Sequence, residues 1–240
     1  QLKGSEVFDT YYVYDDSGNV CFVLPPLIED EIYVANLNRY AYQYRYDINN
    51  RCIWKKLPGM DPVYYIYDQG DRLVFSQDGE QRKKKEWMFS IPDIFGRIVL
   101  KGYCKNTLDY TADTLKTILV QANWIGGTTF TKGYRISGVT LEDPVILSVN
   151  YYDSYEFMRN NGIPAITDND FKPETIMGYG AQYTLGGYKG LLTGTLNAQV
   201  STDGALSSTY LYSVMYYDNR GRLIQTKSNN HLPGGIEKEY

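Results

Sequence analysis

The feature that most constrains this chain is a short pattern, Tyr-Asp followed three or four residues later by Gly and Arg, that recurs between residues 46 and 98. Its three copies begin at Tyr46, Tyr67 and Pro92, the last with Pro in the place of Tyr. The Asp residues of successive copies are 21 and 25 residues apart. Internal periods of roughly 20 to 50 residues are typical of stacked supersecondary units. The pattern therefore predicts a repeat architecture.

Each copy has the composition of a β-hairpin. A Tyr-rich run with high strand propensity precedes the Asp, as in Tyr42–Tyr46 and Val63–Tyr67, and an apolar run such as Leu73–Phe75 or Ile98–Leu100 follows the Arg. Between the runs lie Asp, Asn and Gly. An Asp side chain bonds the backbone two residues on, and Gly or Asn adopts positive φ at low cost. We therefore expect strand, Asp-x-x-Gly turn, strand.

Further copies extend the repeat toward both ends of the chain. They begin at Tyr14 and Tyr217, and a degenerate copy at Tyr152 keeps Tyr-Asp but lacks the Gly-Arg half. We assign structural repeat positions to Tyr14, Asp15, Gly18, Tyr46, Asp47, Arg51, Tyr67, Asp68, Arg72, Asp93, Gly96, Arg97, Tyr152, Asp153, Tyr217, Asp218, Gly221 and Arg222.

Several longer stretches add to the repeat: Leu57-Pro58-Gly59, residues 77–82, 87–89, 150–153, 189–195 and 216–231. On these stretches, which with the repeat cover most of the chain, it resembles the Rhs, or YD-repeat, family of bacterial surface and secreted proteins. The closest resemblance is to the large Bacteroidetes members. The chain departs from the family pattern at Pro92, where Tyr is expected, and at Asn50, where Gly is expected.

The resemblance implies an all-β fold of antiparallel hairpins in a curled or spiralling sheet. We expect an open sheet, because a closed shell needs many more hairpins. We expect a single domain over residues 1–240, with a helix-containing insertion at about 105–127 and a loop-rich segment at about 157–175. The implied function is that of a structural shell segment of a secreted or cell-envelope protein, which encapsulates or presents a cargo or toxin domain or contacts a cell surface. Its implied partners are the remainder of a larger chain or another copy, through sheet edges.

Outside the repeat, the clearest helical signal lies at residues 111–123. Leu115, Ile118, Leu119 and Ala122 fall on one helical face, Thr111 or Asp113 can cap the start, and Gly126-Gly127 follow the end. The basic run 82–86 is interpreted as a solvated turn, residues 28–38 stay open between loop, helix and strand, and residues 228–240 carry no fold signal. Other strands are expected at 7–14, 20–24, 128–136, 145–152, 191–199, 208–217 and 221–226.

Charge and composition argue against several classes of function. A net charge of −4 gives no electrostatic footprint for nucleic acid. No apolar run reaches the roughly 20 residues that a membrane-spanning helix needs. Cys21, Cys52 and Cys104 have no metal-like spacing, and we expect them to be reduced and packed as small apolar side chains.

No catalytic or cofactor pattern stands out. The single histidine, His231, lies in a turn-rich tail, and the glycines of 177–194 lack the context of a phosphate-binding loop. Asp168-Asn169-Asp170 with Asp153 or Glu174 offers oxygen ligands for Ca²⁺, but without EF-hand spacing a solvated loop is the preferred interpretation. The sequence therefore predicts no enzyme, no cofactor and no metal.

Tyrosine content leaves one alternative function open. The chain has 25 tyrosines in 240 residues, and exposed aromatic rings on a sheet can stack against sugars. The alternative is therefore a carbohydrate-binding module, with a cell-surface glycan as partner. A buried stack would make the aromatics structural, whereas three or more in one exposed groove would favour binding. The deciding residues are Tyr64, Tyr65, Tyr67, Trp87, Tyr212 and Tyr216.

Overall fold

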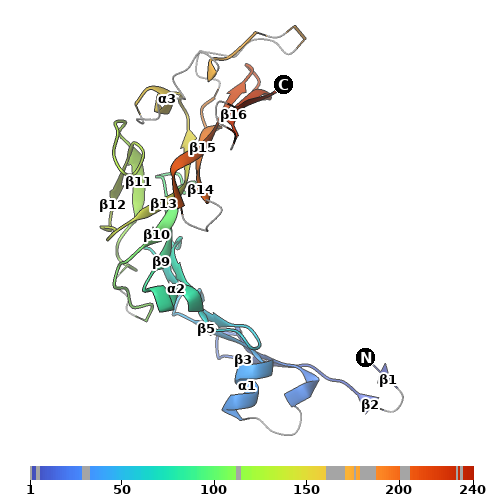
Figure 1. Ribbon diagram of the computed structural model, residues 1–240. Helices are drawn as coiled ribbons and strands as arrows, with labels where there is room; N and C mark the ends of the chain where they lie inside the picture. The colour runs from blue at the N-terminus through green and yellow to red at the C-terminus, as the bar shows by residue number, and fades with distance from the viewer. Residues whose placement is uncertain are drawn as a thin grey trace. The chain divides into compact units, whose positions relative to one another are not determined.

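Figure 1 shows the computed structural model, a mostly β protein built of antiparallel hairpins, as expected. It describes residues 2–3, 6–28, 33–111, 115–160, 171–175, 177–178, 188–200, 206–230, 232 and 235–240. Internal contacts divide the chain into two compact units. The first unit holds residues 1–88 and 104–119, and the second holds 89–103 and 120–240. The single-domain assignment stays a prediction.

The first unit contains an antiparallel run of strands in chain order. The run comprises β3 (Tyr11–Tyr14), β4 (Val20–Leu24), β5 (Tyr42–Tyr46), β6 (Cys52–Lys56), β7 (Val63–Tyr67) and β8 (Leu73–Gln77). Strands β1 (Leu2–Lys3) and β2 (Glu6–Val7) pair separately. The helices of this unit are η1 (Pro26–Ile28), α1 (Val34–Tyr40) and α2 (Gly79–Lys84). Its core includes Trp54, Ile66 and Phe75, all buried.

The second unit continues the same design after the division, which falls within β9 (Trp87–Pro92). The strands that follow β9 are β10 (Ile98–Cys104), β13 (Val145–Tyr152), β14 (Leu192–Val200), β15 (Leu206–Tyr217), β16 (Leu223–Asn229) and β17 (Ile236–Glu239). A separate hairpin joins β11 (Gln121–Trp124) and β12 (Tyr134–Ser137), and α3 spans Phe157–Asn160.

The pairing register between hairpins is the same at four junctions, where a junction is the pairing of the second strand of one hairpin with the first strand of the next. The equivalent pairs are Phe22↔Gln43, Trp54↔Tyr64, Leu100↔Val149 and Gly194↔Val214. Each pair joins a residue four after a positive-φ turn residue to a residue four before the Asp of the next copy. A one-residue slip would turn every side chain of a strand to the other face, so a common register implies common constraints.

Aromatic rings packed on strand glycines build the core of the second unit. A Cβ at Gly194 would collide with the ring of Phe157, and one at Gly102 would collide with Phe89 and the Val145 carbonyl. Tyr151 stacks on Phe157, with ring centroids 4.3 Å apart. The Tyr151 hydroxyl donates to the Lys132 carbonyl at 3.0 Å, which ties the β11–β12 hairpin to β13.

The helix predicted over 111–123 is wrong wherever the structure describes that segment, and the insertion at about 105–127 stays a prediction. Residues 115–117 form a turn, and β11 begins at Gln121; residues 112–114 lie outside the described residues. The apolar spacing fits a helix, but Ala122 is buried in a strand whose register Gln121↔Ser137 pairs it with β12. Tertiary strand pairing has overridden the local pattern.

The basic run 82–86 is also corrected, because α2 extends through Lys84. Its N-cap is a capping box: the Asp78 side chain accepts from the Gln81 backbone, and the Gln81 side chain accepts from the Asp78 backbone. Arg82 donates to the Pro62 carbonyl at 2.6 Å and lies over the Tyr64 ring. Arg82–Lys84 therefore belong to a capped helix rather than to a turn, while Lys83, Lys84 and Lys85 are exposed to solvent, as expected.

The segment 28–38, which the sequence left open, contains the start of helix α1 at Val34. Other segments differ from expectation: the strand predicted over 128–136 begins only at Tyr134, and the tail contains β17. The predicted loop-rich segment opens with α3, and residues 161–170 lie outside the described residues.

Candidate functional site

The Asp of each repeat organises its turn through one carboxylate. In the second copy, Asp68 Oδ1 accepts from the backbone N–H of Gly70 at 2.9 Å and of Arg72 at 3.0 Å, while Oδ2 accepts from Arg72 Nε at 3.0 Å. The Asp68 N–H donates to the Arg72 carbonyl. We call this five-residue arrangement the Asp turn. The same bonds recur in the turns that begin at Asp47, Asp93 and Asp218.

The turn that begins at Asp15 is a variant in which asparagine replaces arginine. Asp15 Oδ1 accepts from the backbone of Ser17 and Asn19, and Oδ2 accepts from Asn19 Nδ2 at 3.1 Å. One carboxylate therefore satisfies several turn donors whether the fourth following residue is charged or neutral.

The third residue after each Asp takes the left-handed conformation. These residues are Gly18, Asn50, Asp71, Gly96 and Gly221, with φ between 57° and 83°. A left-handed residue closing a type I turn matches the twist of the strands that flank it. The second copy therefore uses Asp71 at this position, and its only turn glycine, Gly70, lies one residue earlier.

The repeat tyrosines reach back to the preceding hairpin. Tyr46 donates to the Val20 carbonyl at 3.1 Å, Tyr67 to the Cys52 carbonyl at 3.0 Å and Tyr217 to the Leu192 carbonyl at 2.6 Å. Each acceptor is the first residue of the strand against which the tyrosine's own strand pairs. The tyrosines thus fix one hairpin against the one before it.

Asn150 does the same work at the junction of β10 and β13. Its Nδ2 donates to the Ile98 carbonyl at 2.9 Å, and Ile98 is the first residue of β10. The sequence pattern did not single out Asn150, because it lies two residues before the degenerate Tyr-Asp copy instead of within it.

The fourth residue after the Asp reaches forward to the next turn. Arg51 donates to the Asp68 carbonyl at 3.2 Å and to Asp71 Oδ1 at 2.7 Å, and its guanidinium lies 5.0 Å from the Tyr67 ring centroid. Asn19 Nδ2 donates to Asn50 Oδ1 at 3.0 Å. These contacts join consecutive turns with polar and cation–π interactions.

The degenerate copy receives such a contact instead of forming an Asp turn. Arg97 donates to both oxygens of Asp153, at 3.2 and 2.6 Å, and its guanidinium lies 4.2 Å from the half-buried Tyr152 ring. Asp153 also accepts from the Gly190 N–H at 2.5 Å. Asp153 therefore links β10 to the β13–β14 connection.

Hydrogen bonding keeps these carboxylates ionised. Partial burial raises the pKa of Asp47, but hydrogen bonds from Arg51 and Asn49 outweigh it and leave that pKa below its usual range. Hydrogen bonds from Arg97 lower the pKa of Asp153 against an opposing effect of burial, and Asp153 in turn raises the pKa of Arg97. The Arg222 backbone N–H lowers the pKa of Asp218.

Two repeat positions are more open than their counterparts. Arg222 bonds its own Asp218 at 2.6 Å with 70% of its side chain exposed. Tyr14 is 57% exposed, and its hydroxyl makes no hydrogen bond to the residues that the structure describes. The Asp turn is thus common to both units, whereas the contacts between turns differ from copy to copy.

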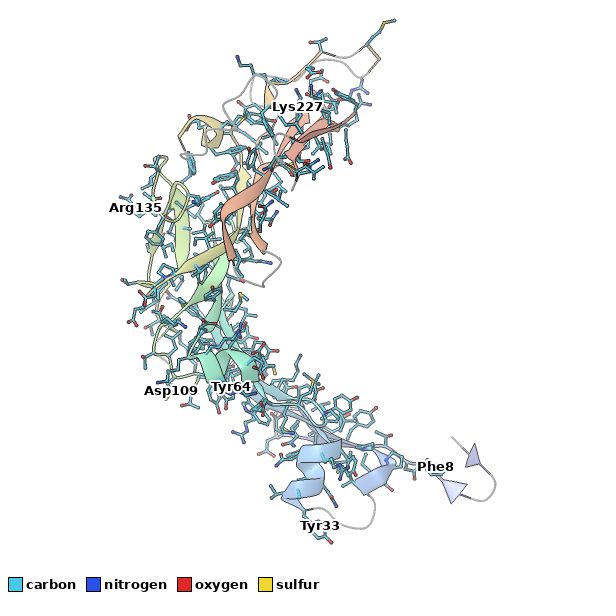
Figure 2. The ribbon with its side chains drawn as sticks, viewed as in Figure 1. Phe8, Tyr33, Tyr64, Asp109, Arg135 and Lys227 are labelled. Atoms are coloured by element: carbon cyan, nitrogen blue, oxygen red, sulfur yellow. The ribbon has the colours of Figure 1, made fainter. Side chains whose placement is uncertain are left out.

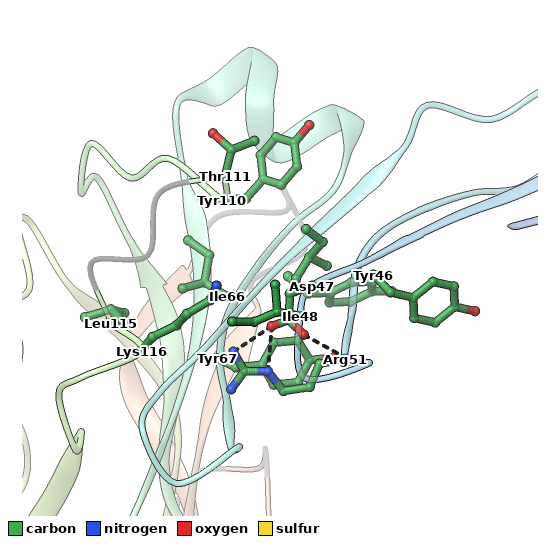
Figure 3. Close-up of a pocket in the computed structure, with 12 residues that line it drawn as sticks. Tyr46, Asp47, Ile48, Arg51, Ile66, Tyr67, Tyr110, Thr111, Leu115 and Lys116 are labelled. Carbon is green, nitrogen blue, oxygen red and sulfur yellow. Dashed lines mark hydrogen bonds and ion pairs between the residues drawn. The ribbon is translucent and has the colours of Figure 1, made fainter. Parts of the chain in front are cut away.

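A groove of about 340 Å³ lies beside the first two arginine-containing turns in the first unit (Figure 3). Its lining includes four tyrosines, Tyr46, Tyr65, Tyr67 and Tyr110, together with apolar side chains such as Ile48 and Leu115. Asp47 and Arg51 reach it while bonded to each other, as Figure 3 shows. The groove presents aromatic faces and few uncommitted polar atoms.

The six deciding aromatic residues divide between the two outcomes. Trp87, Tyr212 and Tyr216 are buried. Tyr64 stacks on Tyr110, with centroids 4.0 Å apart, and only Tyr65 and Tyr67 of the six line the groove.

Lys227 of β16, labelled in Figure 2, forms an ion pair with Glu174 in the second unit. The Lys227 ammonium is fully buried and donates to Glu174 Oε1 at 2.7 Å, which also accepts from Lys238 at 2.8 Å. These hydrogen bonds lower the pKa of Glu174 to about 2. Glu174 is thereby committed to lysine partners.

Other predicted residues lie largely outside the described part of the chain. His231, Asp168–Asp170 and half of the glycine-rich segment, residues 179–187, belong there. Among the described residues, no group of three or more His, Cys, Asp or Glu side chains is arranged to hold a metal ion, and the three cysteines are not joined by a disulfide. The described helices include none with the length and apolar character to cross a membrane.

Comparisons with known proteins give a loose structural likeness. No protein-family model matches the chain, and no curated protein matches it. The crystal structure of TcdB2-TccC3 without its hypervariable C-terminal region is 10% identical, with a TM-score of 0.39 over 98% of this chain and 10% of that chain. The TcdB2-TccC3-Cdc42 structure gives 9% identity and a TM-score of 0.38 over the same shares of the two chains. The chain thus spans about a tenth of each of these chains, and a likeness at this level identifies no family.

Proposed function

We propose that this chain is a structural segment of the β-sheet shell of an Rhs, or YD-repeat, protein that encloses or presents a cargo or toxin domain. In this proposal the protein is secreted or held in the bacterial cell envelope. The partners of the segment are the remainder of a larger chain, or another copy, through sheet edges. No catalytic step is assigned to it.

The observation that carries the proposal is the repeated junction. Four junctions share one register, and the Asp turns beside them are linked by arginine, asparagine and tyrosine side chains of the repeat. Hairpins joined only to their neighbours form a quasi-one-dimensional array that can be lengthened one unit at a time. Such an array suits a wall.

The chemistry of the repeat residues supports the same conclusion. The carboxylates of Asp47 and Asp153 are occupied by arginine and backbone donors and are held ionised. A general acid or nucleophile needs a perturbed, accessible group with a free lone pair or proton. The Asp47 carboxylate is committed to its own turn, and the Asp153 carboxylate to the junction with Arg97.

The test is cargo protection in the full-length protein that contains this chain. Limited trypsin digestion should leave regions enclosed by the repeat intact, and the double variant Arg51→Ala, Arg97→Ala should expose them to cleavage at least several times faster. Arg220→Ala is the matched control, because Arg220 lies in an Asp turn but uses only its backbone there. If trypsin cleaved the regions thought to be enclosed at the same rate in the unaltered protein, the double variant and the control, an enclosing role would be excluded.

Carbohydrate binding stays a second candidate function, although the groove holds only two of the six deciding residues, Tyr65 and Tyr67. Four tyrosines line the groove, and aromatic faces stack on the apolar faces of pyranose rings. In isothermal titration with hexasaccharides of neutral pyranoses, Tyr65→Ala should weaken binding at least tenfold. Tyr12→Ala is the control and should leave binding unchanged, because Tyr12 is an exposed tyrosine that does not line the groove. Absence of heat with the unaltered chain would remove this candidate.

A further inference from the structure

Strand β3 is an edge of the sheet in the first unit. It pairs with β4 from Tyr11↔Leu24 to Tyr14↔Val20, and no other described strand pairs with it. All four of its side chains, Tyr-Tyr-Val-Tyr, are uncharged and between 43% and 57% exposed. Phe8, labelled in Figure 2, precedes the strand and is exposed as well. Edges of this kind, without lysine or proline, are ready templates for another strand.

The same edge corresponds to one of the two strands of a junction. β3 is the first strand of a repeat hairpin, the position that β5, β7 and β15 hold at completed junctions. At those junctions the repeat tyrosine donates to a carbonyl of the preceding hairpin. Tyr14 holds the equivalent place, but its hydroxyl has no acceptor and its ring no guanidinium among the described residues.

We propose that β3 docks the second strand of a further hairpin of the same type, one that carries arginine at the fourth position after its Asp. In the common register, the residue four after the positive-φ position of the incoming turn pairs with Tyr11. The Tyr14 hydroxyl then donates to the carbonyl of the residue after the arginine. The guanidinium covers the Tyr14 ring and donates to the Asp15 carbonyl, as Arg51 does to Tyr67 and the Asp68 carbonyl.

The chain's own completed junctions point to a partner outside the described residues. The second strands β4, β6, β10 and β14 already pair with β5, β7, β13 and β15, and β16 pairs with β17. The docking site rests on the proposed function in one respect: it takes the junction to be a unit that can be added repeatedly.

A synthetic hairpin of the chain's own sequence serves as the probe. It spans residues 42–56 with Cys52→Ser, is closed by a disulfide between cysteines added at its ends, and carries a fluorophore. We expect saturable binding to the full chain by fluorescence anisotropy, together with slowed amide exchange at Tyr11–Tyr14. The same probe with Arg51→Ala should bind at least tenfold more weakly, because it loses charged hydrogen bonds.

Variants of the chain locate the contact. Tyr14→Phe should weaken binding of the probe about fivefold, the loss expected for one hydrogen bond. Tyr33→Phe is the matched control, since Tyr33 is similarly exposed beside α1, and it should bind like the unaltered chain. Tyr12→Lys, which adds a charge to the edge, should abolish binding.

Three results would overturn the proposal. The first is that amide exchange in β3 is not slowed at saturating probe. The second is that the probes with and without arginine bind with equal affinity. The third is that, without probe, protection of β3 from amide exchange grows with protein concentration. The last would mean that two copies pair at this edge. Failure here is separable from failure of the proposed function, because destabilisation of the chain by Arg51→Ala tests its internal junctions without the probe.

Discussion

The junction of β6 with β7 and the junction of β10 with β13 solve the same problem with different residues. In the first, the Asp turns are 21 residues apart, and Tyr67 and Arg51 both bridge the two hairpins. In the second, 60 residues separate Asp93 from Asp153, and the β11–β12 hairpin lies between them in sequence. The register is nevertheless the same.

The difference teaches which parts of the motif a junction requires. The tyrosine hydroxyl is replaced by the Asn150 amide, and the second Asp turn is dispensed with. The contact from arginine to the next Asp remains, and it is stronger at Asp153, where Arg97 bonds both carboxylate oxygens. Register and the arginine contact are therefore common to these two junctions, whereas the donor to the first carbonyl varies. The junction of β4 with β5 keeps the register with Asn19 in place of the arginine.

The largest expected difference in stability between the two junctions comes from the close packing at Gly102. Gly102 in β10 occupies the position that Lys56 occupies in β6, nine residues after the Asp. Gly102→Ala would force its Cβ into Phe89 and the Val145 backbone, so we expect it to lower the free energy of unfolding by about 3 kcal/mol. Lys56→Ala should cost about 1 kcal/mol, through its bond to the Asn38 carbonyl. Urea unfolding measures both, and a small loss at Gly102 would contradict the close packing.

The arginine contacts come next in size. Arg97→Ala leaves Asp93 and Asp153 without their shared cation, and we expect a loss of about 2 to 3 kcal/mol. Arg51→Ala should cost about 1 to 2 kcal/mol, because its outward partner Asp71 is 69% exposed and returns to water. Urea unfolding with Arg220→Ala as control gives the order, and a larger effect at Arg51 would reverse the comparison.

The two donors that differ between the junctions, the Tyr67 hydroxyl and the Asn150 amide, should contribute less to the free energy of unfolding, and by equal amounts. Tyr67→Phe and Asn150→Ala each remove one hydrogen bond to the first carbonyl of the preceding strand, at a cost of about 1 kcal/mol each. Tyr65→Phe provides the baseline for the tyrosine change in thermal unfolding, because the Tyr65 hydroxyl donates to no carbonyl of the described residues. If Asn150→Ala proved neutral, the amide would not be the counterpart of the tyrosine.

The smallest expected effect is on how stability depends on pH in acid, through Asp47 and Asp153. The folded-state pKa values of Asp47 and Asp153 lie below their unfolded values, so the unfolded state binds more protons near those values. Their stabilisation is complete above the unfolded pKa, near 4, and is lost as pH falls through the folded pKa. Asp47→Asn and Asp153→Asn should each reduce the slope of stability against pH below about pH 4. Slopes equal to that of the unaltered chain would show that the arginine contacts do not hold these pKa values down.

Local chemistry made much of the fold predictable from sequence. The strands Val20–Leu24, Tyr42–Tyr46, Val63–Tyr67 and Val145–Tyr152 have the predicted bounds. Strand propensity and turn residues act within a few positions, so the sequence pattern alone is enough to predict these strands.

Contacts between hairpins could not be predicted in the same way. Nothing near Asn150 or Arg97 in sequence indicates that they meet Ile98 and Asp153, because the register that aligns them is set between strands far apart in the chain. The helix predicted at 111–123 failed for the same reason. Its spacing was helical, but pairing with β12 decided the outcome.

The four-residue offset of the junction has a consequence for how such a chain can change in evolution. Alignment is set close to the turns, so the length of sequence between two hairpins does not enter into it. Closing a longer loop is cheap, at about 0.6 kcal/mol for each doubling of its length. The 60 residues between Asp93 and Asp153 show an insertion already accommodated. Each connection between hairpins is thus a position where new sequence can enter while the sheet on either side keeps its register.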